Sequence, residues 1–431
     1  MRPEPFIAAI RFGHGRRPWE PLPADPKAAL VAALDRTATP KLAEAALPDL
    51  AAIGAMIRED GESMRQGQGR PHQARIWRAE LSAALAETLT SAAPFRERLV
   101  QFWANHFTVA RGKVPYVVGH FVREAIRPHV TGQFSDMLLA VVRHPAMIGY
   151  LDNQGSVGPN SRAARTRPRG LNENLAREIL ELHTLTPAAG YTQADVTSFA
   201  NILTGWSIAP VNPPFGFIFR DAAHEPGAKT VMGQEYAEGE GGGIAALAWL
   251  AEHEATQRHL ARKLAIHFVA DTPPPAAVAA LFAVLRDTRG DLGAVARRLV
   301  TLEAAWKPPL TKLRAPIDYM VAVLRALEAP AQVSEGLINT SQFLGQPAWN
   351  ARAPNGWPDQ MADWAAPEAI LRRVQWAYGQ AGRGAGRDAT ALAEAVMGPL
   401  IHPKTLQAAS RAGSAREALT LVLTSPEFQR R

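Results

Sequence analysis

Helical periodicity dominates the pattern of hydrophobic and polar positions along this chain. Alanine- and leucine-rich stretches fill residues 26–110, with breaks at Pro40 and near Pro71, and this composition favours helix. Two further helices are predicted over 114–127 and 134–143. Apolar residues spaced three and four positions apart lie on one face of a helix. The fold is therefore predicted to be mainly α, with many helices in a large globular body.

One stretch departs from this periodicity. In FGFIF, residues 215–219, phenylalanine occupies every second position, and the short run KTVMG follows at 229–233. Such alternation is typical of a β-strand. We predict one small β-hairpin insertion near 215–234, followed by a flexible glycine-rich connection, EGEGGG, at 238–243.

Length and composition fit a globular protein with a large core. The chain has 431 residues, of which 47% are hydrophobic and 20% are charged. We expect residues 1–431 to form a single large helical domain, with a sub-division possible near 235–245. Cysteine is absent, which excludes disulfide scaffolds and thiolate chemistry.

Partners and location follow from charge and hydropathy. The formal charge is +7, but the arginines are scattered among alanine-rich helices, so we predict no specific nucleic-acid binding. No apolar run reaches the roughly 18 residues of a transmembrane helix. The opening residues lack an adequate signal peptide. A cytoplasmic location is therefore expected.

The densest group of polar side chains lies in LNENLAREILELHTLTPAAG, residues 171–190. Four of them share one stripe of the predicted helix: Asn174, Arg177, Glu178 and Glu181. Because leucines flank the stripe, we predict a buried network that is costly unless its charges pair. If it is catalytic, Arg177 would keep Glu178 ionised, and Glu181 would be the better candidate for the acid.

Candidate binding residues lie elsewhere along the chain. His106 stands among aromatic neighbours on one helix face, where it is either a satisfied core histidine or a residue with a ligand or acid–base role. The turn PNGWPD holds Asn355, Trp357 and Asp359. Its prolines fix the backbone around an indole that either plugs the structure or stacks on a ligand. Trp206 is a further candidate.

A metal site is one hypothesis for function. Its oxygen and nitrogen ligands would come from the following residues: His106, Glu178, Glu181, His183, His224 and His267. No His-Glu-x-x-His run is present, so a site would have to assemble from distant segments. The sequence identifies neither the metal nor any other cofactor.

Two classes of function are therefore weighed. The favoured one is a helical scaffold or accessory partner in which the Asn/Arg/Glu network fixes helix packing. The alternative is a hydrolase-type enzyme that uses the paired carboxylates, or a His/Glu metal site, on a polar polymer or glycan. The sequence does not decide whether the protein is an enzyme, nor does it identify a substrate.

Several motifs together carry a family resemblance, and they keep their order over nearly the whole chain: FWANHF, HPAMIGYLDN, NENLAREILELHTL, GYTQADV, LTGW, AKTVMGQ, ARKLAIHFV and PNGWPD. The chain resembles the bacterial domain of unknown function 1800 family. The resemblance implies a largely helical fold, and many members look exported. It also implies a possible partner from the domain of unknown function 1501 family, which looks sulfatase-like and commonly carries a twin-arginine signal. Such a partner could take this protein across a membrane.

Overall fold

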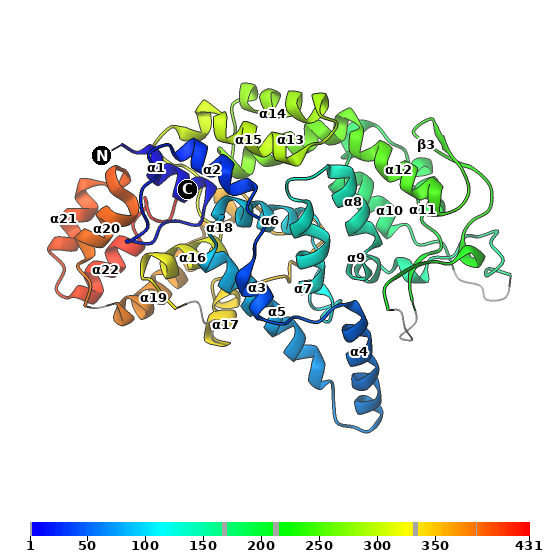
Figure 1. Cartoon of the computed structure of the whole chain (residues 1–431), viewed down its shortest axis with the longest axis horizontal. Helices are drawn as coiled ribbons and strands as arrows, with labels where there is room; N and C mark the ends of the chain where they lie inside the picture. The colour runs from blue at the N-terminus through cyan, green and yellow to red at the C-terminus, as the bar shows by residue number, and fades with distance from the viewer. Residues whose placement is uncertain (1, 166–169, 210–214, 331–334, 385) are drawn as a thin grey trace.

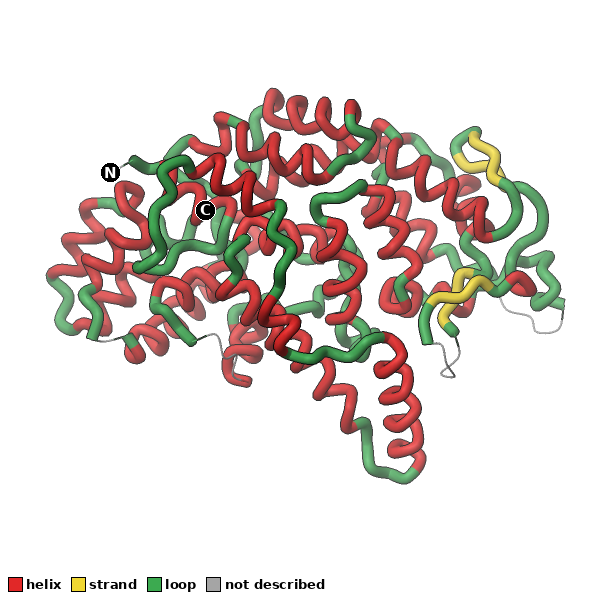
Figure 2. Tube along the Cα trace, in the orientation of Figure 1, coloured by secondary structure: helices red, strands yellow, loops and turns green. Residues whose placement is uncertain are grey.

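The structure is a computed structural model that describes residues 2–431 except for 166–169, 210–214, 331–334 and 385. It is mainly α-helical, as predicted. In the part that is described, strands form only two short antiparallel pairs. Figure 2 shows both pairs at one end of the molecule.

Helices of the first half appear in this order: α1 (Glu4–Ile7), η1 (Ala8–Phe12), α2 (Pro26–Leu34), α3 (Pro40–Glu44), α4 (Leu50–Arg65), α5 (Pro71–Thr90), α6 (Pro94–His106), α7 (Val118–His120), η2 (Phe121–Ile126), η3 (Arg127–His129), α8 (Phe134–Arg143), α9 (Pro145–Tyr150), η4 (Asn153–Gly155), α10 (Asn174–Glu178), η5 (Ile179–His183), η6 (Pro187–Ala189) and α11 (Gln193–Ile202). Those of the second half are η7 (Asp221–Ala223), α12 (Glu240–Glu252), α13 (Glu254–Phe268), α14 (Pro275–Asp287), α15 (Leu292–Thr301), η8 (Glu303–Trp306), α16 (Pro316–Ala326), α17 (Glu335–Phe343), α18 (Met361–Trp364), α19 (Pro367–Arg383), α20 (Ala389–Met397), η9 (Gly398–Leu400), α21 (Pro403–Ser410) and α22 (Ala415–Leu423).

Capping side chains set many of the helix starts. Asp25, Asp49 and Asp291 each accept a hydrogen bond from the backbone N–H three residues further on, at the starts of α2, α4 and α15. Thr192 and Asp195 form a reciprocal capping box at α11. Both side chains therefore satisfy backbone N–H groups at the start of this helix.

The helices form an elongated body with a projecting arm. α13, α14 and α15 run along one edge, while α19 to α22 lie at one end and α8 to α12 at the other (Figure 1). α4 packs on α5, and the two project away from the body. Buried side chains form one continuous cluster from Phe6 to Phe428. This core joins segments from both ends of the sequence, whereas the division into domains stays a prediction.

Three of the four strands in the described residues overlap the predicted region, the first lies upstream of it, and the pairing differs from the prediction. β1 (Trp206–Ile208) pairs with β2 (Phe217–Phe219), and β3 (Lys229–Val231) pairs with β4 (Gln234–Tyr236). The phenylalanine run therefore pairs with an upstream strand and not with KTVMG. The β3–β4 turn is made by two residues with positive φ, 48° and 77°, which is the geometry of a tight hairpin turn.

The glycine-rich stretch is not a flexible connection, because α12 begins inside it, at Glu240. Gly243 lies in the first turn of this helix and faces the indole of Trp206. A Cβ at position 243 would come within 2.6 Å of that ring. Glycine is therefore needed there for close packing, and the helix continues through it despite its low helix propensity.

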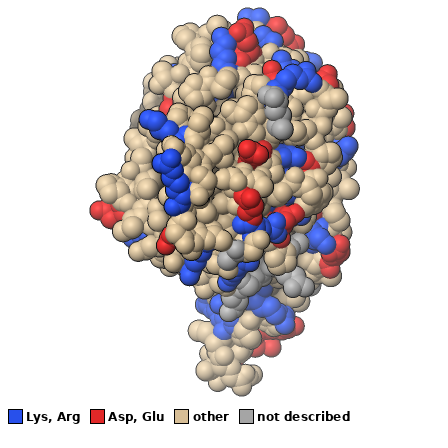
Figure 3. Space-filling view, turned by 90° about the vertical axis from the view of Figure 1, so that its left-hand side faces the viewer, with Lys and Arg blue, Asp and Glu red and all other residues tan. Residues whose placement is uncertain are grey.

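Charged side chains are mixed over the face shown in Figure 3, where lysine and arginine lie among aspartate and glutamate. The positive net charge is therefore not gathered into one dominant area on that face. Among the described residues, no helix has the length and apolar character needed to cross a membrane.

Candidate functional site

A cavity of about 380 Å³ lies between α5, α6, α13, α16 and the loop that precedes α18. Leu85, Phe102 and Phe121 belong to its largely apolar wall. Its polar end includes His267 and Asp359. This combination suits a small organic molecule with an apolar body and a polar group at one end.

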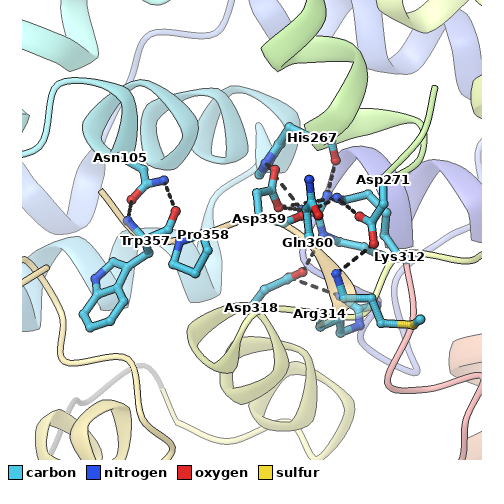
Figure 4. A network of polar contacts seen from close by, with 12 residues as sticks. Asn105, His267, Asp271, Lys312, Arg314, Asp318, Trp357, Pro358, Asp359 and Gln360 are labelled. Carbon is cyan, nitrogen blue, oxygen red and sulfur yellow. Dashed lines mark hydrogen bonds and ion pairs between the residues drawn. The ribbon is translucent and has the colours of Figure 1, made fainter. Parts of the chain in front are cut away.

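Asn105, the last residue but one of α6, holds the loop against the cavity. Its side-chain NH₂ donates to the carbonyl oxygen of Trp357 (2.9 Å), and its side-chain oxygen accepts from the Trp357 backbone N–H (2.8 Å; Figure 4). Gly356 has φ +78°, and a Cβ there would lie 2.4 Å from the Asn105 carbonyl oxygen. The turn is therefore clamped to α6, and only glycine fits at its closest approach.

His267 and Asp359 form the central pair of the polar end. His267 Nδ1 donates to Asp359 Oδ2 at 2.7 Å, which leaves Nε2 with the lone pair in the neutral ring. Among the described residues, this buried Nε2 has no hydrogen-bond partner. Burial lowers the pKa of His267 to about 4, although the Asp359 charge opposes this shift. The ring is therefore neutral near pH 7 and can accept a proton.

The Asp359 carboxylate is held in its charged form. Burial raises its pKa, but His267, Arg431 and Lys312 outweigh that effect and leave the pKa well below its usual value. Arg431 lies 3.2 Å from Asp359 Oδ1, and Lys312 Nζ lies 3.6 Å from the same oxygen. Lys312 also pairs with Asp271 at 2.6 Å.

A second buried carboxylate, Asp318, joins the site to the core (Figure 4). It pairs with Arg98 (2.7 Å), Arg314 (3.1 Å) and Arg431 (3.2 Å). These three arginines hold the pKa of Asp318 well below its usual value, even though burial raises it. Arg431 contacts both carboxylates, so the two clusters form one continuous network.

Lys263 and His106 lie on another part of the cavity wall. Lys263 Nζ is 3.0 Å from His106 Nδ1. Burial lowers the pKa of Lys263 to about 8, against the opposing charge of Asp359. His106 is fully enclosed and meets the Trp103 ring edge-on. The structure therefore gives this histidine both a core position and contact with the cavity.

The predicted polar stripe lies away from this cavity, on α10 and the π-helical turn η5 that follows it. Asn174 is exposed, whereas Arg177, Glu178 and Glu181 are half-buried. The prediction of a buried network is therefore wrong. The apolar side of this segment, with Leu175 and Ile179, is the buried one, whereas the polar stripe lies on the partly exposed side and contacts α11. The helix also widens after Glu178, so the spacing of an ordinary α-helix does not extend to Glu181.

Pairing within the stripe also differs from the prediction. Arg177 pairs with Glu173 at 3.0 Å and donates to Gln193 at 2.9 Å. Burial and the Glu181 charge raise the pKa of Glu178, with Arg177 opposing them. The stripe is thus a surface network that joins α10 to α11.

The five binding candidates divide into two groups. His106, Asn355, Trp357 and Asp359 all line the cavity. Trp206 does not line it: this fully buried indole packs against Phe217 at the strands. Sequence reasoning thus marked four residues that the fold brings together, and their binding role stays a prediction.

The metal candidates are scattered. Within the described part of the chain, no group of three or more histidine, aspartate or glutamate side chains is placed to hold a metal ion. His183 lies beside His106, with ring centroids 5.9 Å apart. His224 instead contacts Lys229 near the strands.

Sequence reasoning missed Lys263, Asn105 and Arg431. Lys263 stands four residues before His267, so both lie on one side of α13. His259 continues the same row, and these three basic side chains at four-residue spacing were the available signal. Asn105 and Arg431 gave no comparable signal, because their partners are distant in sequence.

Comparison with known proteins gives a family and no activity. No curated protein and no solved structure matches this chain. The family model described as "Protein of unknown function (DUF1800)" matches residues 7–430. The chain therefore belongs to the DUF1800 family.

Proposed function

We propose that this protein is an enzyme that performs acid–base chemistry on a small, largely apolar organic molecule. The molecule would bind in the cavity between α6 and α13, and His267 would act as the general base. This places the proposed chemistry at His267 and Asp359 in place of Glu178 and Glu181.

One observation carries the proposal: His267 lines the cavity and is oriented by Asp359, while its buried Nε2 has no hydrogen-bond partner among the described residues. A general base needs a neutral ring, a fixed tautomer and a free lone pair. The carboxylate supplies orientation and would stabilise the imidazolium that forms after proton transfer. A buried polar atom without a partner is costly, so its retention is readily explained by a ligand.

The test is turnover in a complex mixture. Purified protein is incubated with a small-molecule cell extract, and metabolites that disappear or form are measured by mass spectrometry. We expect His267→Gln to lower turnover roughly 100-fold or more, in line with the loss of a general base. Asp359→Asn should lower turnover too, because it removes the charge that orients the ring.

The matched control is His129→Gln, which replaces a half-buried imidazole that does not line the cavity. It should keep wild-type turnover, and thermal melts should show that all variants are folded. The proposal fails if the wild type converts nothing, or if His267→Gln converts its substrate as fast as the wild type.

A scaffold or accessory role is the second candidate, and exposed apolar side chains favour it. Leu371 and Tyr378 lie seven positions apart on α19, and Leu421 lies on the adjacent α22. All three are exposed large side chains, a feature of partner-binding surfaces. A protein of the 1501 family, co-expressed with this chain, is the proposed partner.

Co-purification tests this second role. Leu371→Glu combined with Leu421→Glu should abolish recovery of the partner without lowering the melting temperature, since both positions face solvent. Met64→Glu on the projecting α4 is the matched control, because Met64 is equally exposed but distant in the fold. Equal recovery with every variant would contradict this surface as the binding site.

A further inference from the structure

Lys263 lines the cavity from the same side of α13 as His267. The two residues are four positions apart in Glu254–Phe268, and both line the cavity. His259 continues this row one turn earlier. A ligand that reaches the His267 ring therefore passes close to a primary amine.

The surroundings of this amine differ from those of an ordinary lysine. Among the described residues, no carboxylate lies within ion-pair distance of Lys263 Nζ, and its hydrogen-bond partner is His106 Nδ1 at 3.0 Å. His106 Nε2 is 3.1 Å from the carbonyl oxygen of His183. A carbonyl oxygen only accepts, so Nε2 carries the hydrogen and Nδ1 is the acceptor. Lys263 therefore donates to a neutral imidazole.

The two other histidines near the amine are neutral as well, and the opposing negative charge comes from Asp359, which makes no ion pair with Lys263. His259 Nε2 donates to the carbonyl oxygen of Leu182 at 3.2 Å. Both ring nitrogens of His183 are buried without partners in the described part of the chain. Burial lowers the pKa of these two imidazoles to about 4 and about 3, so both are neutral at pH 7.

An ammonium group in this position loses water and gains no counter-ion in direct contact. Burial therefore lowers the pKa of Lys263 to about 8. About a tenth of the molecules carry the neutral amine at pH 7, roughly 200- to 300-fold more than for a lysine of ordinary pKa. Desolvation of this kind is one of the ways in which proteins make a lysine nucleophilic.

We propose that Lys263 captures the carbonyl group of an aldehyde or ketone bound in the cavity and forms an imine with it. The inference rests on the proposed function in one respect: the same cavity must hold the ligand. It adds the substrate class, an apolar molecule with a carbonyl group at its polar end.

The step balances without an oxidant or a reductant. The amine lone pair of Lys263 forms a C–N bond while the C=O π pair moves to oxygen. His106 Nδ1 is placed to accept one N–H proton and pass it to that oxygen. The carbon–oxygen bond then breaks, and oxygen leaves as water with both hydrogens that the amine nitrogen originally carried. A C=N bond remains, in the cavity that His267 also lines.

Reductive trapping tests this inference on the wild-type protein. Hexanal and cyanoborohydride are added near pH 7.5, and peptide mapping locates the alkylated lysines. We expect the Lys263 adduct to exceed those of Lys307 and Lys312 at least about tenfold, because Lys263 lines the cavity and both controls are held in ion pairs. Lys307 is an exposed control, and Lys312 is a buried control that is paired with Asp271.

A cavity-filling variant shows whether the aldehyde enters through the cavity. Ala348 lines the cavity, so Ala348→Trp should lower Lys263 labelling at least tenfold, whereas Ala188→Trp, at an exposed position, should not. Equal labelling of Lys263 and Lys307 would overturn the inference. So would Lys263 labelling that Ala348→Trp leaves unchanged.

Failure here is distinguishable from failure of the proposed function. If Lys263 is labelled selectively but His267→Gln retains full turnover, the general-base role of His267 is contradicted and imine formation at Lys263 is supported. If turnover depends on His267 but Lys263 is not labelled selectively, imine formation is contradicted and the general-base role of His267 is supported.

Discussion

The polar stripe of α10 and the polar end of the cavity contain the same kinds of side chain in different surroundings. In the stripe, Arg177 has a local partner, Glu173, four residues away, and both are partly in water. In the cavity, Asp318 is enclosed by arginines, and its pair with Arg98 spans 220 positions. Charged residues that are close in sequence pair with one another at the surface. The enclosed site is instead assembled from single residues that are distant in sequence.

The largest expected difference between the two regions concerns Asp318. Asp318→Asn leaves Arg98, Arg314 and Arg431 without their shared counter-charge, which should cost about 3–5 kcal/mol of unfolding free energy. Urea denaturation measures this loss. Asp287→Asn, at an exposed ion pair, is the matched control and should change stability by less than about 1 kcal/mol. Equal effects of the two substitutions would remove the contrast.

The next largest effect is expected in the dependence of stability on pH. The pKa of His267 falls from 6.5 to about 4 on folding, so between these values the unfolded chain binds a proton that the folded one does not. Stability is therefore lost as pH falls through this window. The wild type should lose up to about 1.4 kcal/mol per pH unit more than His267→Gln. Denaturation curves from pH 7 to 4 measure this, and parallel profiles would contradict it.

A smaller loss of stability is expected when the hydrogen bonds between Asn105 and the loop are removed. Asn105→Ala removes both hydrogen bonds to the Trp357 backbone, and we expect a loss of about 1–2 kcal/mol. Hydrogen exchange should show faster opening at the Trp357 amide. Asn339→Ala, at an exposed position on α17, is the control. An unchanged exchange rate would show that the loop holds its position without Asn105.

The smallest effect is expected in the stripe. Because the pKa of Glu178 is raised, its ionised form is disfavoured in the folded state. Glu178→Gln should therefore leave stability at pH 7 unchanged or slightly higher, within about 1 kcal/mol. Thermal denaturation checks this. A loss of several kcal/mol would instead show that the stripe fixes helix packing.

Local features of the fold could be predicted from the sequence. Thr192 and Asp195 lie close together along the chain, so their capping box needs no distant contact. The π-helical turn at Ile179–His183 is different, because its hydrogen bonds replace the α-helical period on which the stripe prediction depended. Gly243 likewise depends on contact with the distant Trp206, which the local glycine run does not reveal.

The site could be predicted only in part, because it too depends on contacts between residues that are distant in sequence. PNGWPD draws attention to Trp357 and Asp359 because prolines and an indole stand out from alanine-rich helices. Nothing in that turn shows that His267, 92 positions earlier, meets the carboxylate. Nor does the sequence distinguish His267, with a free nitrogen, from a histidine whose ring is fully satisfied.

Arg431 reaches Asp318 and Asp359 from a position far along the chain from either. The long segments between these residues must lose conformational entropy before the ion pairs can form. Contacts between residues distant in sequence therefore form late in folding. Newly made chains should therefore acquire helices early and a working pocket late. Occupancy of that pocket would then report that folding had reached completion.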